Sequence, residues 1–177
     1  MIETARLILR DWEPRDREPF AAINADPRVM ETLVRPLSRK ESDALVDRLA
    51  GIAAQHGHSF WAMERRADGA TIGFCGLVRG AKDTPIVGEP EIGWRLAYDA
   101  WGQGYAREAA EATLDWAWAR LDDGAVAAIT ALSNTRSSGL MQRLGMRPFP
   151  DEEFDHLRVP EGDKLRRHCV YRIARPA

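Results

Sequence analysis

The spacing of apolar residues along positions 91–118 predicts a strand, a turn and a helix. Residues 91–97 alternate between polar and apolar side chains, which is typical of a strand with one buried face. Gly102 and Gly104 follow and allow the backbone a sharp turn. Apolar residues then recur at intervals of three and four, as in a helix with one buried stripe; they are Ala106, Ala110, Leu114, Ala117 and Leu121.

The remaining patterns predict a mixed fold around that unit. Ser38 with Glu41 three residues later is a capping-box pattern, and Asp68-Gly69 is a hairpin turn. Residues 125–132 are nearly all apolar, as in a strand covered on both faces. The predicted strands are 6–12, 58–65, 71–78, 91–97, 125–132, 146–154 and 165–173, and the predicted helices are 13–24, 38–55, 104–121 and 134–144. The order βααβββαβαββ indicates an α/β (α+β) domain with a central mixed, mostly antiparallel sheet of about seven strands and four helices.

Length and composition limit the class of protein. With 177 residues and 45% apolar content, the chain fits one globular domain over residues 1–177. A net charge of −2 and a pI near 6.1 argue against a nucleic-acid or membrane-surface partner, because either would favour a basic excess. Cys75 and Cys169 are too few for a disulfide scaffold, so we expect reduced thiols and a cytoplasmic protein. No signal-peptide pattern or bilayer-length apolar run occurs, which predicts a protein neither exported nor embedded.

The glycine turn is a candidate phosphate site. The first amides of a helix have no carbonyl partner four residues back, and the helix dipole makes that end positive, so both suit a pyrophosphate. A plain tight connection is the competing interpretation for an isolated G-x-G. A Rossmann dinucleotide site requires a third glycine where Arg107 stands, and the Gly-Lys-Ser/Thr of a P-loop is absent. A Rossmann-type nucleotide-binding domain therefore ranks third among the alternatives.

Two motifs at the expected element boundaries carry a family resemblance. Residues 101–106, Trp-Gly-Gln-Gly-Tyr-Ala, resemble motif A of the GNAT superfamily of acyl-CoA N-acyltransferases, Q/R-x-x-G-x-G/A. Trp101 departs from the usual first residue, and with the following G-x-G-Y-A-x-E-A it is similar to the branch of ribosomal-protein N-terminal alanine acetyltransferases. Residues 134–146, N-x-x-S and a helix ending L-G-M, resemble motif B. The resemblance covers essentially the whole chain and implies the GNAT fold.

The resemblance implies acetyl-CoA as cosubstrate and a way to hold it. The pantetheine arm is expected on exposed backbone of Trp94, Arg95 and Leu96, where the central strand of the family usually bulges and splays from its neighbour. The side chain of Asn134 is expected to hydrogen-bond the cofactor arm. The pyrophosphate is expected on the backbone amides of Gly102, Gln103, Gly104, Tyr105, Ala106 and Arg107.

Amine attack on a thioester needs a neutral amine and a proton for the departing thiolate. Glu91, at the start of the central strand, is the first candidate base and Glu89 the second, although a glutamate at a strand start is as often merely solvated. The acid tyrosine of many relatives falls at Met141, which cannot donate a proton. Ser137 is the nearest replacement, with a helix-cap role or water as the alternatives. Positioning of the amine near the thioester accounts for much of the rate in such a reaction.

The acceptor is expected to be a primary amine, either a protein N-terminus or a small molecule. Arg28, Arg35 and Arg39 are weak indications of an acidic acceptor. His56 and His58 have metal-ligand spacing but no accompanying carboxylate pattern, so no metal is predicted. The alternative from another class is a non-catalytic acyl-CoA-binding module of the same fold. Monomer and homodimer both remain open.

Overall fold

The computed structural model describes residues 1–176, in which nine strands form one open sheet in the order β1-β2-β3-β4-β5-β6-β9-β7, with β8 also paired to β9. Only the pairing of β5 with β6 is parallel among these strands, which confirms the mixed, mostly antiparallel sheet. The strands are β1 (Ile2–Glu3), β2 (Leu7–Arg10), β3 (Phe60–Arg65), β4 (Ala70–Arg79), β5 (Pro90–Leu96), β6 (Ala125–Ala131), β7 (Arg147–Pro148), β8 (Phe154–Asp155) and β9 (Arg167–Ala174). The helices are α1 (Arg17–Ala25), α2 (Pro27–Met30), α3 (Arg39–His56), α4 (Tyr105–Arg120) and α5 (Thr135–Arg143), with 3₁₀ turns η1 (Pro14–Asp16), η2 (Tyr98–Ala100) and η3 (Pro150–Glu152).

The structure adds the two-residue strand β1, which the sequence did not predict, and two further segments differ from the prediction. The single strand predicted over residues 146–154 is wrong, because η3 separates the short strands β7 and β8. Pro150 explains the break, because it begins η3 and proline has no amide hydrogen to donate to a sheet ladder. The helix count is five rather than four because Pro27 begins the short α2, whose first turn is capped by the Asp26 side chain accepting from the Arg28 amide.

Local signals correctly predict the ends of α3. The Ser38 side chain accepts from the Glu41 amide while the Glu41 carboxylate accepts from the Ser38 amide, which forms the predicted capping box. Gly57 ends the helix with φ 75°, a left-handed conformation that glycine adopts without a steric cost. α3 therefore has firm boundaries set by residues within its own terminal turns.

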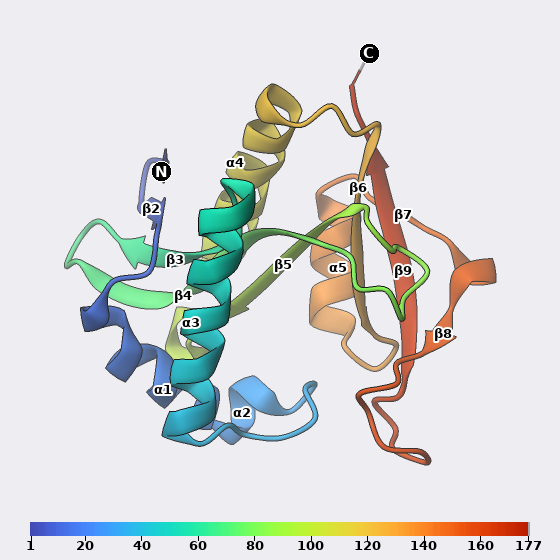
Figure 1. The fold of residues 1–177 in the computed structure, drawn as a ribbon, viewed down its shortest axis with the longest axis horizontal. Helices are drawn as coiled ribbons and strands as arrows, with labels where there is room; N and C mark the ends of the chain where they lie inside the picture. Colours follow the sequence, from blue (N-terminus) through green and yellow to red (C-terminus); the bar gives the residue numbers. More distant parts are fainter. Residues whose placement is uncertain (177) are drawn as a thin grey trace.

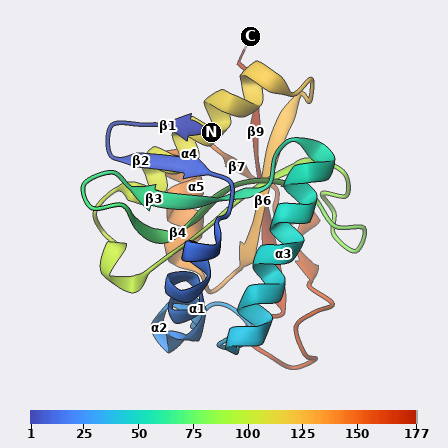
Figure 2. The ribbon, with the colours of Figure 1, turned by 60° about the vertical axis from the view of Figure 1, so that its left-hand side comes forward.

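Helices cover both faces of the sheet, and the alternation of β4 shows how. Leu77 packs in a buried cluster with residues of α4, including Leu114, whereas Phe74 packs with Phe20 of α1 and Val46 of α3. Figure 1 shows α3 passing in front of the sheet, and Figure 2 gives the same arrangement from the side. Within residues 1–176, none of the helices combines the length and the apolar character required to cross a bilayer.

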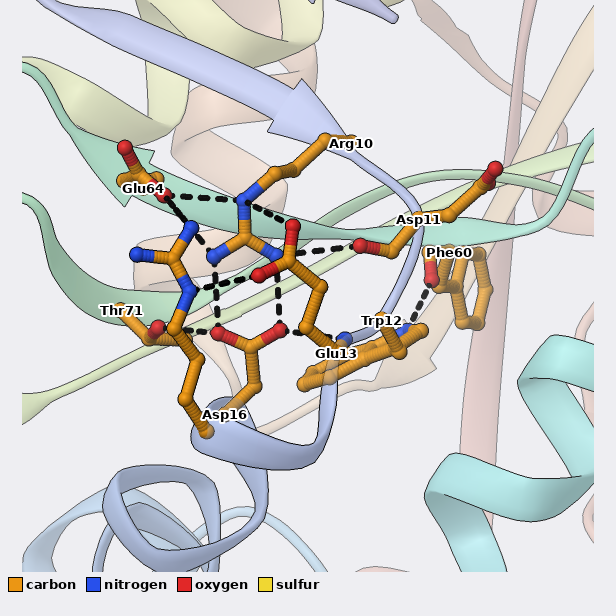
Figure 3. Close-up of polar contacts among 9 residues, drawn as sticks. Arg10, Asp11, Trp12, Glu13, Asp16, Phe60, Glu64 and Thr71 are labelled. Carbon is orange, nitrogen blue, oxygen red and sulfur yellow. Dashed lines mark hydrogen bonds and ion pairs between the residues drawn. The ribbon is translucent and has the colours of Figure 1, made fainter.

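A buried ion cluster joins η1 to strands β2, β3 and β4 (Figure 3). Asp16 is fully buried and accepts from Arg10 Nη1 at 2.7 Å and Nη2 at 2.9 Å, and from Thr71 Oγ1 at 2.6 Å. Glu64 of β3 accepts from Arg10 Nε at 2.8 Å. Burial opposes ionisation of Asp16, but the hydrogen bonds from Arg10 and Thr71 outweigh it and lower its pKa.

Candidate active site

The turn before α4 presents a row of backbone amides. Gly102 and Gly104 both have positive φ, 72° and 82°, and no side chain caps the first turn of α4. The backbone amides of residues 102–107 have no acceptor among residues 1–176, whereas the Glu108 amide donates to the Gly104 carbonyl and starts the helical ladder. This geometry has the form of an anion site at a helix N-terminus.

Arg6 fixes the position of that turn. Its Nη1 donates to the Gln103 carbonyl at 2.9 Å, its Nε donates to Glu108 Oε2 at 2.6 Å, and its guanidinium lies 4.6 Å from the centre of the Tyr105 ring. Burial opposes ionisation of Glu108, but hydrogen bonds from Thr4 and Arg6 outweigh it and lower its pKa. Sequence reasoning missed Arg6, because only the fold brings residue 6 beside residues 103–108.

β5 and β6 are paired at a single position. Their ladder contains one residue pair, Glu91 opposite Ala127, and the remainder of β5 has no β6 partner. β5 pairs with β4 without a register shift, so the expected bulge is not in β5; the irregularity lies between β3 and β4, beside Met63 and Glu64. β5 is thus unpaired with β6 beyond Glu91, as expected, but it does not contain the expected bulge.

The three strand residues expected to hold the cofactor arm fall into two groups. The Ala97 amide donates to the Ile72 carbonyl of β4, and alternate residues of a strand point their amides to opposite edges. Arg95 therefore uses its backbone for pairing with β4, which differs from the expectation, while Trp94 and Leu96 direct theirs toward the edge that has no β6 partner. The Leu96 carbonyl already accepts from Trp101 Nε1 at 3.0 Å.

The two candidate bases have different environments. Burial raises the pKa of Glu91 to about 7, and the charge of Arg158 partly opposes this shift. Glu89 instead forms a two-point ion pair with Arg172, at 2.7 Å and 2.9 Å, and Arg172 also binds Glu152. Glu91 thus has the pKa required of a base at neutral pH, and Glu89 has a structural partner.

Asn134 and Ser137 form the N-terminal cap of α5. Asn134 Oδ1 accepts from the Ser137 amide at 3.2 Å, while its Nδ2 donates to Ser137 Oγ at 3.1 Å and to Thr130 Oγ1 at 3.0 Å. These contacts account for the hydrogen-bonding capacity of the Asn134 amide hydrogens. Met141 is 2% exposed and belongs to the core around α4, so it is a packing residue.

A cavity of about 770 Å³ lies between the α2–α3 connection, α3, β5 and the loop that follows β8. Arg48, Arg95 and Arg158 line it, together with His156 and His168. Burial lowers the pKa of both histidines. In Figure 1 the connection after α2 and the loop after β8 both lie on the lower side of the molecule.

The arginines singled out from the sequence already have acidic partners. Arg28 pairs with Asp26 at 2.6 Å, Arg39 pairs with Asp43 at 2.9 Å, and Arg35 pairs with Glu41. They therefore carry little unbalanced positive charge. His58 is buried, and its Nδ1 lies 3.0 Å from the Leu77 carbonyl, as a core histidine would. In the described part of the chain, no group of three or more His, Cys, Asp or Glu side chains is placed to hold a metal ion.

Comparison with known proteins is consistent with this geometry. The family model described as acetyltransferase (GNAT) domain matches residues 6–147. The uncharacterized protein YkkB of Bacillus subtilis strain 168 is 31% identical over 144 residues, which are 81% of this chain and 83% of that protein.

Solved structures share the fold. An acetyltransferase (GNAT family) from Bacillus anthracis has a TM-score of 0.80 at 22% identity, over 98% of both chains. Spermidine N-acetyltransferase from Vibrio cholerae, in complex with CoA and spermine, has a TM-score of 0.74 at 17% identity, over 97% of both chains. RimL, a ribosomal L7/L12 alpha-N-protein acetyltransferase in complex with CoA, has a TM-score of 0.76 at 15% identity, over 97% of this chain and 95% of that one.

Proposed function

Since the chain belongs to the GNAT acetyltransferase family, we propose that it transfers an acetyl group from acetyl-CoA to a primary amine by direct attack of the amine on the thioester. The acceptor class comprises small-molecule amines and peptide N-termini. The observation that carries the proposal is the uncapped turn at Gly102–Arg107, whose free amides suit a pyrophosphate, together with the edge of β5 that has no β6 partner beyond Glu91 and suits the attached arm.

The cofactor is proposed to bind by backbone contacts. Its pyrophosphate accepts from the free amides of residues 102–107, and its arm extends along the unpaired edge of β5 at Trp94 and Leu96. Acetyl-CoA supplies the activated acyl group, and the protein supplies position and proton transfer. An amide on that edge also suits the polarisation of the acyl carbonyl.

Glu91 is proposed to take the proton from the amine. A base with a pKa of about 7 is half ionised at neutral pH and accepts a proton more readily than a carboxylate of ordinary pKa. Ser137 or a water molecule returns a proton to the thiolate. The Ser137 hydroxyl accepts from Asn134 Nδ2 through a lone pair, which leaves its own hydrogen available to donate.

The runner-up is a non-catalytic acyl-CoA-binding module, favoured by the absence of a tyrosine at Met141. The deciding experiment measures acetyl-CoA binding by calorimetry and free thiol release with a panel of amines, amino acids, aminoglycosides and N-terminal peptides. Amine-dependent thiol release supports the enzyme. Tight binding with no transfer to any amine supports the module, and no binding of acetyl-CoA refutes both.

A further inference from the structure

Three arginines that line the cavity have no carboxylate partner among residues 1–176. Arg48 of α3, Arg95 of β5 and Arg158 of the loop after β8 form none of the ion pairs of the described chain. They reach the cavity from different segments of the chain. Glu41 also lines the cavity, but it is already paired with Arg35 and with the start of α3. The cavity therefore has an excess of positive charge.

Arg95 is the least solvated of the three. Burial lowers its pKa to about 10, and repulsion from Arg48 adds to that shift. Its Nη1 donates to the neutral Asn24 Oδ1 at 2.6 Å, and its guanidinium lies 5.5 Å from the centre of the Phe74 ring. Its Nε is buried without any hydrogen-bond partner. A desolvated guanidinium with only a neutral acceptor is costly unless a bound anion compensates it.

Arg48 and Arg158 are exposed, and alone they would be ordinary surface arginines. They line the same cavity as Arg95 and have no acidic partner, whereas the other arginines of this region, Arg28, Arg35 and Arg39, are paired. Guanidinium groups are the side chains best suited to two-point binding of a carboxylate.

We propose that the acceptor is a small primary amine that bears a carboxylate, such as an amino acid, and that this carboxylate is recognised by Arg48, Arg95 and Arg158. The inference rests on the proposed acetyl transfer and names its substrate class. Arg95 and the proposed base Glu91 lie on the same face of β5, because both are odd-numbered residues of a strand that pairs with β4 without a register shift. The same positive charge disfavours polyamines, which are polycations.

The first test compares L-amino acids with their C-terminal amides in the acetyl-CoA assay. The α-amine of an amide is less basic than that of the free acid, so amine basicity alone favours the amide. We expect kcat/KM to be higher for the acid, by about tenfold or more, because the charge-assisted contact is absent from the amide. Equal rates for acid and amide, or a preference for spermidine, would overturn the substrate class and leave acetyl transfer intact.

The second test uses Arg48→Gln and Arg158→Gln, because both positions are exposed and Arg95 also supports Asn24. Each variant is expected to lose about tenfold more in kcat/KM for the acid than for the amide, and any effect of the Arg158 charge on Glu91 acts on both substrates and cancels in this ratio. Arg39→Gln is the matched control, since Arg39 lies on α3 and pairs with Asp43. A comparable loss of acetyl-CoA affinity in Arg48→Gln would show that the arginines bind the cofactor phosphates, and would refute the inference.

A binding measurement keeps the inference separate from catalysis. Glutarate, which has carboxylates and no amine, is titrated into the CoA-loaded protein by calorimetry. Binding that is lost in the Arg48→Gln/Arg158→Gln double variant supports the carboxylate site, even if no amine is acetylated and the proposed activity fails. Absence of glutarate binding to the wild-type protein, or binding that the double variant retains, refutes the site.

Discussion

Replacing Glu91 by glutamine tests the proposed proton route directly. Glutamine keeps the size of the side chain at the point where β5 meets β6 and removes the ionisable group. Since burial raises the pKa of Glu91 to about 7, the group changes charge within the pH range in which the enzyme would be assayed. The effect of the substitution must therefore depend on pH in a predictable way.

The magnitude follows from the ionised fraction. A carboxyl group with a pKa of about 7 is about one tenth ionised at pH 6, half ionised at pH 7 and about nine tenths ionised at pH 8. General-base catalysis contributes at least about 100-fold. We therefore expect the ratio of wild-type to Glu91→Gln kcat/KM to rise from about 10 at pH 6 to about 100 at pH 8. Titration of the acceptor amine affects both proteins equally and cancels in this ratio.

Although Glu91→Gln should lose activity, it should gain folding stability relative to the wild type as the pH rises. The pKa of Glu91 is raised in the folded state, so the stability associated with its neutral form is present below its ordinary pKa of 4.5 and is lost as the pH rises through about 7. The loss at pH 8 is about 3 kcal/mol at most, and less because Glu91 is partly exposed. Glutamine stays neutral, so the variant should gain stability relative to the wild type between pH 4.5 and pH 8 in urea denaturation.

The assay is free thiol release under kcat/KM conditions from pH 5.5 to pH 9, with Glu89→Gln as the control. Glu89→Gln weakens the Arg172 ion cluster and should lower the melting temperature without a pH-dependent activity ratio. A wild-type to Glu91→Gln ratio that is constant across pH would assign Glu91 a structural role. A ratio near one at every pH would exclude it as the base.

Three further substitutions test the site and its support. Gly104→Val should abolish most acetyl-CoA affinity measured by calorimetry. The control Gly57→Val changes a glycine with a similar positive φ far from the turn, and should lower stability alone. An acetyl-CoA affinity of Gly104→Val equal to that of the wild type would refute the pyrophosphate site. Asn134→Ala should lower stability by about 1 kcal/mol and Asn134→Ser should restore it, so a Michaelis constant for acetyl-CoA that stays raised in the serine variant would indicate direct cofactor contact. Asp16→Ala should cost about 3–5 kcal/mol at pH 7 by leaving Arg10 without its main partner. Because the pKa of Asp16 is lowered in the folded state, that difference should shrink as the pH falls below about 4, and urea denaturation at pH 7 and pH 3 checks the sign.

Features that depend on neighbouring residues could be predicted from the sequence. The capping box of Ser38 and Glu41, the helix end at Gly57 and the turn at Gly102 and Gly104 each involve residues a few positions apart. The strand and helix on either side of that turn follow from periodicity, and the observed β5 and α4 agree with them. Local sequence contains the information for these elements because their hydrogen bonds and dihedral angles are local.

The sequence prediction failed where proline interrupts a strand and where a residue contacts others that are distant in the sequence. The strand predicted at 146–154 ignored Pro150, a signal that was present in the sequence. Arg6 was missed because it approaches Gln103 and Glu108 only in the folded chain. No spacing rule connects positions about 100 residues apart.

Charge was the property least accessible from sequence. Composition shows a chain that is acidic by two charges, and the sequence of the first loop offers Arg28, Arg35 and Arg39 as weak indications of an acidic acceptor. The tertiary structure neutralises those three with Asp26, Glu41 and Asp43, and instead leaves Arg48, Arg95 and Arg158 around one cavity. It also buries Glu91, which raises the pKa of this carboxyl to about 7, while Glu89 is held by Arg172. Coulomb energy and desolvation depend on distance and burial in space, and a linear sequence specifies these only through the fold.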